Sequence, residues 1–316
     1  MNRQMNGMTL IEILIAMSIG IILLGAVVQT MVLHNQAFRQ SEALALLQEQ
    51  AAVAHRMLRD DIVMSGHWGN ARTGHEIDGA STPSDDNPQS LRVPSRCPAR
   101  MTLNIAQSLE MDKPDDWRCD LDATPDNDGL VVRYASSDHH RAQANKIQLA
   151  SNGITHRLQT TGAHIPADAT PPQYRDVEVR AFYVAPSSSL FPEQPVLRRL
   201  TLSALSSRPI FIDEEITAGI ERFLVRLAVD TNNDDVPDTW ISADDARASR
   251  TDDAGRPLLR AYAVELNLVT RSESPIWKKT RTTPLVIGGR RWQPPSDGYL
   301  RIATRTVVAL RNNSQT

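Results

Sequence analysis

The feature that most constrains the fold is an apolar run near the amino end, residues 13–33, which contains neither a charge nor a proline. At 1.5 Å per residue, a helix of this length is roughly 31 Å long, enough to cross the hydrocarbon core of a bilayer. A buried helix of a soluble protein is rarely apolar on every face over such a length. We therefore expect residues 13–33 to form one transmembrane span. Arg3 precedes the run, so the positive-inside rule predicts a cytoplasmic amino end and an exported remainder.

A cleaved secretory signal peptide shares the basic start and the apolar run. The run here is longer than the apolar region of a signal peptide, which usually has about 7 to 15 residues. Helix-forming residues follow it without an obvious terminator. Glu12 lies at the edge of the run, where burial of an ionised carboxylate costs several kcal/mol unless another group pairs with it. We expect that partner to be an amine of another chain.

The helix is expected to continue well beyond the membrane span. None of the 19 prolines precedes Pro83. After the span, apolar residues recur at steps of three or four, which places them on one helical face: Leu44, Leu47, Ala51, Ala54, Leu58 and Ile62. The pattern predicts one helix over residues 8–66, with its end at Ser65 and Gly66. Its second half should pack the apolar stripe on a globular domain.

Residues 67–316 are expected to form a β-rich head that begins with a loop-dominated region, 67–127, rich in Pro, Asp, Ser and Gly. Seven strand-like runs follow: 130–135, 146–150, 177–184, 196–202, 223–229, 262–269 and 300–310. In the run 262–269, Glu265 and Asn267 alternate with apolar residues, which predicts a strand with one buried face. The expected fold class is α+β, with a long N-terminal helix packed on an antiparallel sheet.

The string GMTLIE at residues 7–12, followed by the apolar helix, resembles the class III signal of type IV pilins and pseudopilins. The resemblance implies that a prepilin peptidase removes the leader 1–7 by cutting between Gly7 and Met8. Met8 would become the N-methylated first residue, although phenylalanine is commonest there in the family. Glu12 would be the fifth residue, which in pilins faces the terminal amine of a neighbouring subunit and thereby serves assembly.

Three patches in the rest of the chain, 128–136, 219–232 and 305–312, resemble minor pilins of the PilW family. The resemblance implies a pilin-like fold and a subunit without enzymatic activity that primes pilus assembly. Its partners would be other minor pilins, the major pilin, a pilus-tip adhesin and the inner-membrane assembly platform. It also implies a single-pass inner-membrane protein with a periplasmic head that reaches the pilus tip and cell surface, with roles in cell adhesion and twitching motility.

Two alternatives stay open. A J-type minor pseudopilin of type II secretion would have the same signal and a similar plan. A membrane-anchored periplasmic enzyme or binding protein would keep its amino end uncut. The sequence contains no G-x-S-x-G elbow, P-loop or G-x-G-x-x-G motif. The adjacent histidines His139 and His140 are more consistent with a surface turn than with a zinc site.

An acidic loop follows the run 223–229, with oxygen side chains at positions 1, 3, 5 and 9 of a calcium-type pattern: Asp230, Asn232, Asp234 and Asp238. Asp235 stands where glycine allows the sharp turn, and Ile241 stands where a bidentate glutamate would close the site. Calcium binding and a plain acidic hairpin loop are both open, and no other cofactor is expected.

The chain has two cysteines, Cys97 and Cys119, and in an exported, oxidising compartment we expect them to form a disulfide rather than two buried thiols. Residues 288–292, with the sequence GGRRW, indicate a glycine turn with a basic flank, or else an anion-binding or strand-binding patch. The net charge of -3 gives no basic footprint for nucleic acid.

Overall fold

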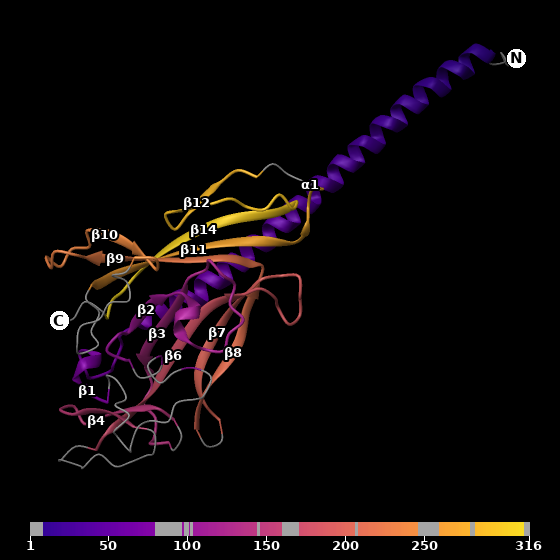
Figure 1. Ribbon diagram of the computed structural model, residues 1–316. Helices are drawn as coiled ribbons and strands as arrows, with labels where there is room; N and C mark the ends of the chain where they lie inside the picture. The colour runs from indigo at the N-terminus through magenta and orange to yellow at the C-terminus, as the bar shows by residue number, and fades with distance from the viewer. Residues whose placement is uncertain are drawn as a thin grey trace, which may run out of the picture. The chain divides into compact units, whose positions relative to one another are not determined.

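The computed structural model describes residues 9–79, 97, 101, 104–143, 146–159, 171–205, 208–245, 259–278 and 282–312 (Figure 1). The chain divides into two compact units, Met1–Leu46 and Leu47–Thr316. One helix, α1, runs from Leu10 to Met64, so it begins in the first unit and ends in the second. The predicted long N-terminal helix is therefore confirmed over its described residues.

The end of α1 has a local cause in the sequence. Gly66 has a φ of 74°, a left-handed conformation that costs glycine little and that commonly ends a helix. The amide N–H of Ser65 still bonds to the carbonyl of Ile62, while that of Gly66 donates to the carbonyl of Arg133 in the head. The chain thus leaves the helix directly onto a strand of the sheet.

The larger sheet has eight strands: β1 (Ile77–Asp78), β2 (Leu109–Asp112), β3 (Gly129–Ala135), β4 (Gln148–Ser151), β5 (His156–Gln159), β6 (Gln173–Ala185), β7 (Val196–Leu205) and β8 (Arg208–Ala218). Its order is β1-β5-β4-β6-β3-β2, with β7 paired to β6 and β8 paired to β7. All of these pairs are antiparallel except β1 with β5.

The second sheet is antiparallel, with the order β10-β9-β11-β14. Its strands are β9 (Ile220–Asp230), β10 (Thr239–Ser242), β11 (Arg260–Pro275) and β14 (Tyr299–Ala309). A separate hairpin, β12 (Leu285–Ile287) and β13 (Arg290–Trp292), turns at Gly288 and Gly289, whose φ angles are 56° and 78°. Two positive φ angles in succession fit a tight hairpin turn, so the predicted glycine turn is confirmed.

The main hydrophobic core of the head joins α1 to both sheets. Ala54, Leu58 and Ile62 of α1 pack in one cluster with residues of β3, β6, β9, β11 and β14. These three helix residues belong to the predicted apolar stripe, and their side chains are fully buried. The opposite face of β3 and β6 is covered by a second cluster, to which the segments carrying Trp68 and Trp117 contribute. Both faces of the larger sheet are therefore covered at its centre.

The predicted loop-dominated region 67–127 contains more regular structure than expected. Its described part holds β1, β2 and two short 3-10 helices, η1 (Gly74–Glu76) and η2 (Pro114–Trp117). Strand β2 was missed because its four residues, LEMD, show no alternation, and it is buried on both faces because Glu110 pairs with Arg133. Strand β8 was also missed, because it contains proline and three consecutive acidic residues. In the structure these acidic residues form ion pairs with Arg198 and Arg199 of β7.

The prediction that β11 buries only one face is wrong. Glu265 is 2% exposed and Asn267 is also buried, although both lie on the face that the alternation assigned to solvent. Glu265 pairs with Arg305 at 2.5 Å and with Arg226 at 3.5 Å, and the side-chain amide of Asn267 donates to it at 3.0 Å. The neighbouring arginines thus allow these polar residues to be buried, which alternation alone does not reveal.

We expect Leu58→Ala to lower the free energy of unfolding of the head by about 3 kcal/mol, because it removes a fully buried side chain and leaves a cavity. The matched control is Val53→Ala on the same helix, where the side chain is 42% exposed and the change should stay within about 0.5 kcal/mol. Urea unfolding of the full chain in detergent, followed by tryptophan fluorescence, measures both. Equal effects of the two variants would contradict the packing of α1 described above.

Candidate functional site

The amino end of α1 is held by a capping box made of Thr9 and Glu12. The backbone N–H of Thr9 donates to Oε2 of Glu12 at 2.9 Å, and the hydroxyl of Thr9 donates to the same oxygen at 3.0 Å. In return, the N–H of Glu12 lies 3.4 Å from the Thr9 hydroxyl oxygen. Sequence reasoning missed this role of Glu12, although Thr-x-x-Glu is a helix-start signature. The predicted cleavage residues Gly7 and Met8 lie outside the described residues.

The first half of α1 carries an apolar surface that the described chain leaves exposed. Every large apolar side chain from Leu10 to Leu33 is exposed, and α1 is the one described helix long and apolar enough to cross a membrane. The hydroxyls of Ser18 and Thr30 donate to the carbonyls four residues earlier, each at 2.8 Å, so they are satisfied without water. Such a surface is stable in lipid or against other apolar helices.

Gly20 and Gly25 lie within this exposed surface. No described atom comes within 4 Å of the position that a Cβ would take at either glycine. The chain itself therefore gives no packing reason for them. Small residues in apolar helices allow close approach of another helix.

A buried ion cluster fixes the second half of α1 to the larger sheet. Asp61 of α1, 2% exposed, pairs through Oδ1 with Arg180 of β6 and accepts a 2.9 Å hydrogen bond from the hydroxyl of Tyr134. Arg199 of β7 lies 3.8 Å from the other oxygen. Burial raises the pKa of Asp61, and the two arginines and the tyrosine oppose that shift only in part. Asp61 follows Leu58 by three residues, so helical spacing alone could have indicated that it is buried.

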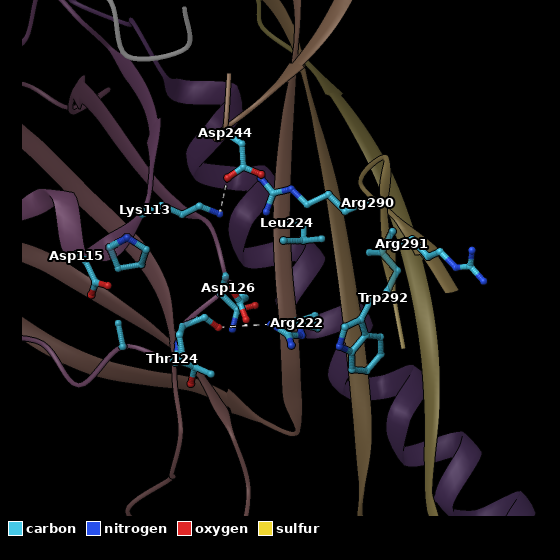
Figure 2. A pocket seen from close by; sticks show the side chains of 15 residues that line it. Lys113, Asp115, Thr124, Asp126, Arg222, Leu224, Asp244, Arg290, Arg291 and Trp292 are labelled. Atoms are coloured by element: carbon cyan, nitrogen blue, oxygen red, sulfur yellow. Dashed lines mark hydrogen bonds and ion pairs between the residues drawn. The ribbon is translucent and has the colours of Figure 1, made fainter. Parts of the chain in front are cut away.

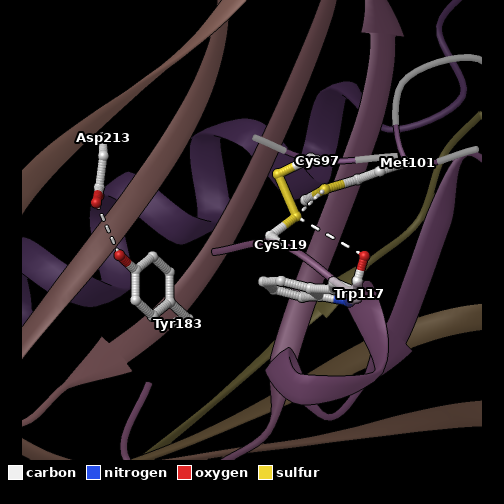
Figure 3. Close-up of a disulfide and its surroundings, with 6 residues drawn as sticks. All are labelled: Cys97, Met101, Trp117, Cys119, Tyr183 and Asp213. Atoms are coloured by element: carbon white, nitrogen blue, oxygen red, sulfur yellow. Dashed lines mark hydrogen bonds between the residues drawn. A yellow bond between two sulfur atoms is a disulfide. The ribbon is translucent and has the colours of Figure 1, made fainter. Parts of the chain in front are cut away.

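Cys97 and Cys119 form a disulfide, with Cα atoms 4.3 Å apart (Figure 3). The bond lies in the core beneath the larger sheet, where Sγ of Cys119 is 3.3 Å from Sδ of Met101 and the ring of Trp117 packs nearby. The predicted pairing of the two cysteines is thus present in the structure. It ties the segment before β2 to the segment after η2.

Arg133 of β3 holds the same part of the chain from the inside. Its side chain is fully buried, and its three nitrogens donate to the carbonyls of Met101 and Gln107, each at 2.8 Å, and to the carboxylate of Glu110 at 2.6 Å. A guanidinium with its donors satisfied in this way tolerates burial. Nothing in the sequence of β3 marks Arg133 as a core residue, so sequence reasoning missed it.

The predicted calcium ligands do not converge on one point. Both oxygens of Asp230 accept backbone N–H groups, from Asn232 and Asn233 at 3.0 and 2.7 Å and from Asp235 at 2.8 Å. Burial raises the pKa of Asp230, but these amides outweigh it, so the pKa lies below its usual range. Asp234 and Asp238 likewise bond within the loop. Among the described residues, no three His, Cys, Asp or Glu side chains form a group that could hold a metal.

A pocket of about 510 Å³ lies between η2, residues 123–127, β9 and the β12–β13 hairpin (Figure 2). Two cations at its wall, Lys113 and Arg290, bridge the same two carboxylates, Asp128 and Asp244, at distances from 2.7 to 3.2 Å. Asp128 is fully buried, and its other oxygen accepts the N–H of Val225 at 2.9 Å. The charges of this cluster therefore neutralise one another and hold the hairpin against the sheet.

The remaining wall of the pocket contains Trp292, whose ring lies under the guanidinium of Arg222 with 5.2 Å from Cζ to the ring centroid. Of the predicted basic flank 290–292, Arg290 is thus committed to ion pairs, while Arg291 extends away from the pocket in Figure 2. The described lining contains no histidine, cysteine or serine.

The pair His139-His140 lies beside β6. The ring of His139 is 3.2 Å from a guanidinium nitrogen of Arg175, and that of His140 is 3.9 Å from a carboxylate oxygen of Asp176. The backbone N–H of His140 bonds to the carbonyl of Tyr174. The structure therefore places both histidines against the strand, with His140 in an isolated antiparallel bridge to Tyr174.

Comparison with known proteins finds two family models in the sequence. Residues 181–312 match the PilW family, described as Type IV Pilus-assembly protein W, and residues 2–28 match the prokaryotic N-terminal methylation motif. Among solved structures, the chain is similar to a type IV-like pilin from Thermus thermophilus, with 13% identity over 65% of this chain and 84% of that chain and a TM-score of 0.33. No curated protein matches.

The pH dependence of stability tests the burial of Asp61. Because its pKa is raised in the folded state, the native chain binds this proton more tightly than the unfolded chain. The stabilisation that protonation of Asp61 contributes is complete below the ordinary pKa of about 3.9, and it is lost as pH rises through the folded-state pKa. We therefore expect the unfolding free energy of the native chain, minus that of Asp61→Asn, to be larger at pH 4 than at pH 7. A difference that shrinks over this range would contradict the burial of the carboxyl.

We expect replacement of both cysteines, Cys97→Ser with Cys119→Ser, to lower the free energy of unfolding by about 3 kcal/mol. The disulfide restricts the conformations of the unfolded chain, and its removal restores that conformational entropy. The two cysteines are 22 residues apart in the sequence. Urea unfolding of the double variant, compared with the oxidised and the reduced native chain, measures the effect. The reduced native chain serves as the control and should resemble the variant; unchanged stability on reduction would contradict the prediction.

Proposed function

We propose, on the premise that the chain carries a PilW-family domain behind an N-terminal methylation motif, that it is a minor type IV pilin that primes pilus assembly. In this proposal it joins other minor pilins in a complex at the pilus tip. The family is one of pilus-assembly proteins rather than known enzymes, which supports a structural role.

The observation that carries the proposal is the position of Glu12 at the start of an exposed apolar helix. Its Oε2 already accepts two hydrogen bonds from Thr9, while Oε1 has no hydrogen-bond partner among the described residues. In lipid or between apolar helices, a carboxylate with an unused oxygen is costly. An ammonium group from an adjoining subunit would offset that cost through a charge-assisted hydrogen bond. The contact would also fix the axial position of the helix, because the carboxylate of Glu12 can meet that ammonium group at only one position along the assembly axis.

Processing and location follow from the same segment. A prepilin peptidase would cut between Gly7 and Met8, and the methylated amine of Met8 would then be available to a neighbouring subunit's equivalent of Glu12. The amino end would lie in the cytoplasm, residues 13–33 in the inner membrane and the head in the periplasm, before transfer to the pilus. The disulfide between Cys97 and Cys119 supports an oxidising compartment for the head. Partners would include the major pilin, the assembly platform and a tip adhesin.

The PilW match favours a pilus over the J-type pseudopilin of type II secretion, since its description concerns pilus assembly. An enzymatic role has less support, because the pocket at Lys113 and Arg290 uses its charges in internal ion pairs. Calcium is not needed for the proposed role, because the loop that begins at Asp230 satisfies its carboxylates with its own amides.

We expect Glu12→Gln to reduce surface piliation at least ~10-fold in a strain that lacks the native copy, since losing an ionic hydrogen bond costs about 1.5–3 kcal/mol. Glutamine can still cap the helix, so the variant removes the charge and keeps the capping box. The matched control, Thr9→Ala, weakens the cap and keeps the charge, and it should assemble. Counts of sheared pili measure the outcome, with intact mass used to verify processing of each variant.

Piliation by Glu12→Gln at the level of the native chain would contradict the role of the carboxylate. Loss of piliation by Thr9→Ala, with Glu12→Gln unaffected, would show that the helix cap matters and the charge does not. The stability of the head should be the same in both variants, because neither residue belongs to the second unit of the chain.

A further inference from the structure

Among the described strands, β14 forms the longest edge of the four-stranded sheet, which we call the smaller sheet. Strand β14 (Tyr299–Ala309) pairs with β11 on one side, and no described strand pairs with its other side. The register with β11 is unbroken from Arg301 to Ala309, without a bulge. Such an edge presents a row of backbone N–H and C=O groups that can pair with a further strand.

The backbone groups that face outward can be assigned from the ladder. The N–H of Leu310 donates to the carbonyl of Tyr262, near the start of β11, at 2.8 Å. Antiparallel pairing alternates from residue to residue, so the even-numbered residues of β14 bond to β11. The odd-numbered residues therefore direct N–H and C=O groups to the open edge, and their side chains are exposed: Ala303, Arg305, Val307 and Ala309.

This edge lacks the features with which proteins commonly block strand addition. Prolines, lysines, bulges and inward-pointing charges serve that purpose, and β14 contains neither proline nor lysine. Arg301 is directed onto its own sheet, where it bonds to Glu221 at 2.6 Å and to Asp297 at 2.7 Å. Val307 is apolar and 49% exposed. The edge is consequently regular and fixed in place, and its exposed side chains are small or apolar apart from Arg305.

The other described sheet edges differ. Strand β10 has only four residues. Strand β8 is as long as β14, but it carries three consecutive acidic residues. Among the described strand edges, β14 combines length and regularity with an absence of proline, lysine and acidic residues.

We propose that β14 is a docking edge for an extended, acidic strand of a different protein, which adds to the smaller sheet by backbone hydrogen bonds. The charge of the edge selects this partner: β14 contains Arg301 and Arg305 and no acidic residue. Arg305 pairs with Glu265 but keeps 63% of its side chain exposed, so it can meet a carboxylate on the added strand. A cross-strand pair of opposite charges is favourable, while like charges opposite one another are not.

The same charges disfavour a second copy of this chain as the occupant. In an antiparallel pairing of two β14 edges centred on Arg305, the two Arg305 side chains would lie opposite each other. The acidic strand β8 of a second copy is a poorer match, because two of its three carboxylate side chains, Asp213 and Glu215, are only 13% and 22% exposed in their pairs with Arg198. The inference depends on the head alone, so its failure would leave the proposed function of the amino end untouched.

The test uses the full chain in detergent with a defined probe, the acetylated and amidated peptide TVEVTVEVT, and its counterpart with lysine in place of glutamate. We expect the acidic peptide to slow amide hydrogen exchange in residues 299–309 and the basic peptide to do so far less. Val307→Pro removes one outward N–H while sparing the bonds to β11, so it should weaken binding by about 10-fold. The matched control, Val307→Thr, keeps the N–H and should bind as the native chain does.

Urea unfolding verifies that each variant is folded, and Ala309→Pro provides a second removal of an outward N–H if Val307→Pro does not fold. The proposal is overturned if the proline and threonine variants bind equally or if the protected amides lie elsewhere, for example in β8. Equal binding of the two peptides would overturn the acidic partner. Concentration-dependent protection of β14 without peptide would identify a second copy as the occupant and would also overturn it.

Discussion

The apolar surface on the first half of α1 is the constraint on which the rest of the account depends. The chain places every large apolar side chain from Leu10 to Leu33 outside its own core, and exposure of such a surface to water is strongly unfavourable. An apolar environment from outside the chain, lipid or other helices, is therefore required. The second half of the same helix meets the opposite condition, because Ala54, Leu58 and Ile62 are buried between the two sheets of the head.

Two carboxylates on α1 illustrate this difference. Asp61 is buried, and its own chain supplies the compensating groups, Arg180, Arg199 and Tyr134. Glu12 has only the cap at Thr9, which occupies one of its two oxygens. Since an ionised group away from water requires a partner, the second oxygen of Glu12 points to a group on another molecule. The two carboxylates thus differ in the source of opposite charge, because Asp61 has two arginines of its own chain nearby, whereas the described part of the chain places no cation beside Glu12.

Much of this arrangement could be predicted from the sequence, because it depends on local periodicity. The apolar run, the stripe from Leu47 to Ile62, the end at Gly66 and the seven principal strands all follow from spacing and turn residues. Leu44, assigned to the same stripe, is instead 38% exposed. The capping box at Thr9 could also have been found in the same way. Strands β2 and β8 could not be predicted in this way, because their acidic residues form ion pairs with arginines of other strands. The burial of Arg133 and Glu265 has the same origin.

The acidic loop shows a different limit. Its spacing fits calcium, but spacing does not say whether a carboxylate binds an ion or the amides of its own turn, and in the structure Asp230 takes the amides. The disulfide was accessible from cysteine count and compartment together, whereas its position beneath the larger sheet depends on tertiary packing.

The central claim is that the exposed apolar helix is the mature amino end of an assembling subunit. Intact-mass and N-terminal analysis of the membrane-extracted chain, with and without a co-expressed prepilin peptidase, tests it most directly. The account predicts a mature chain that begins at methylated Met8 and appears only with the peptidase. A chain that retains residues 1–7 in the presence of the peptidase, or one cut after the apolar run, would contradict it.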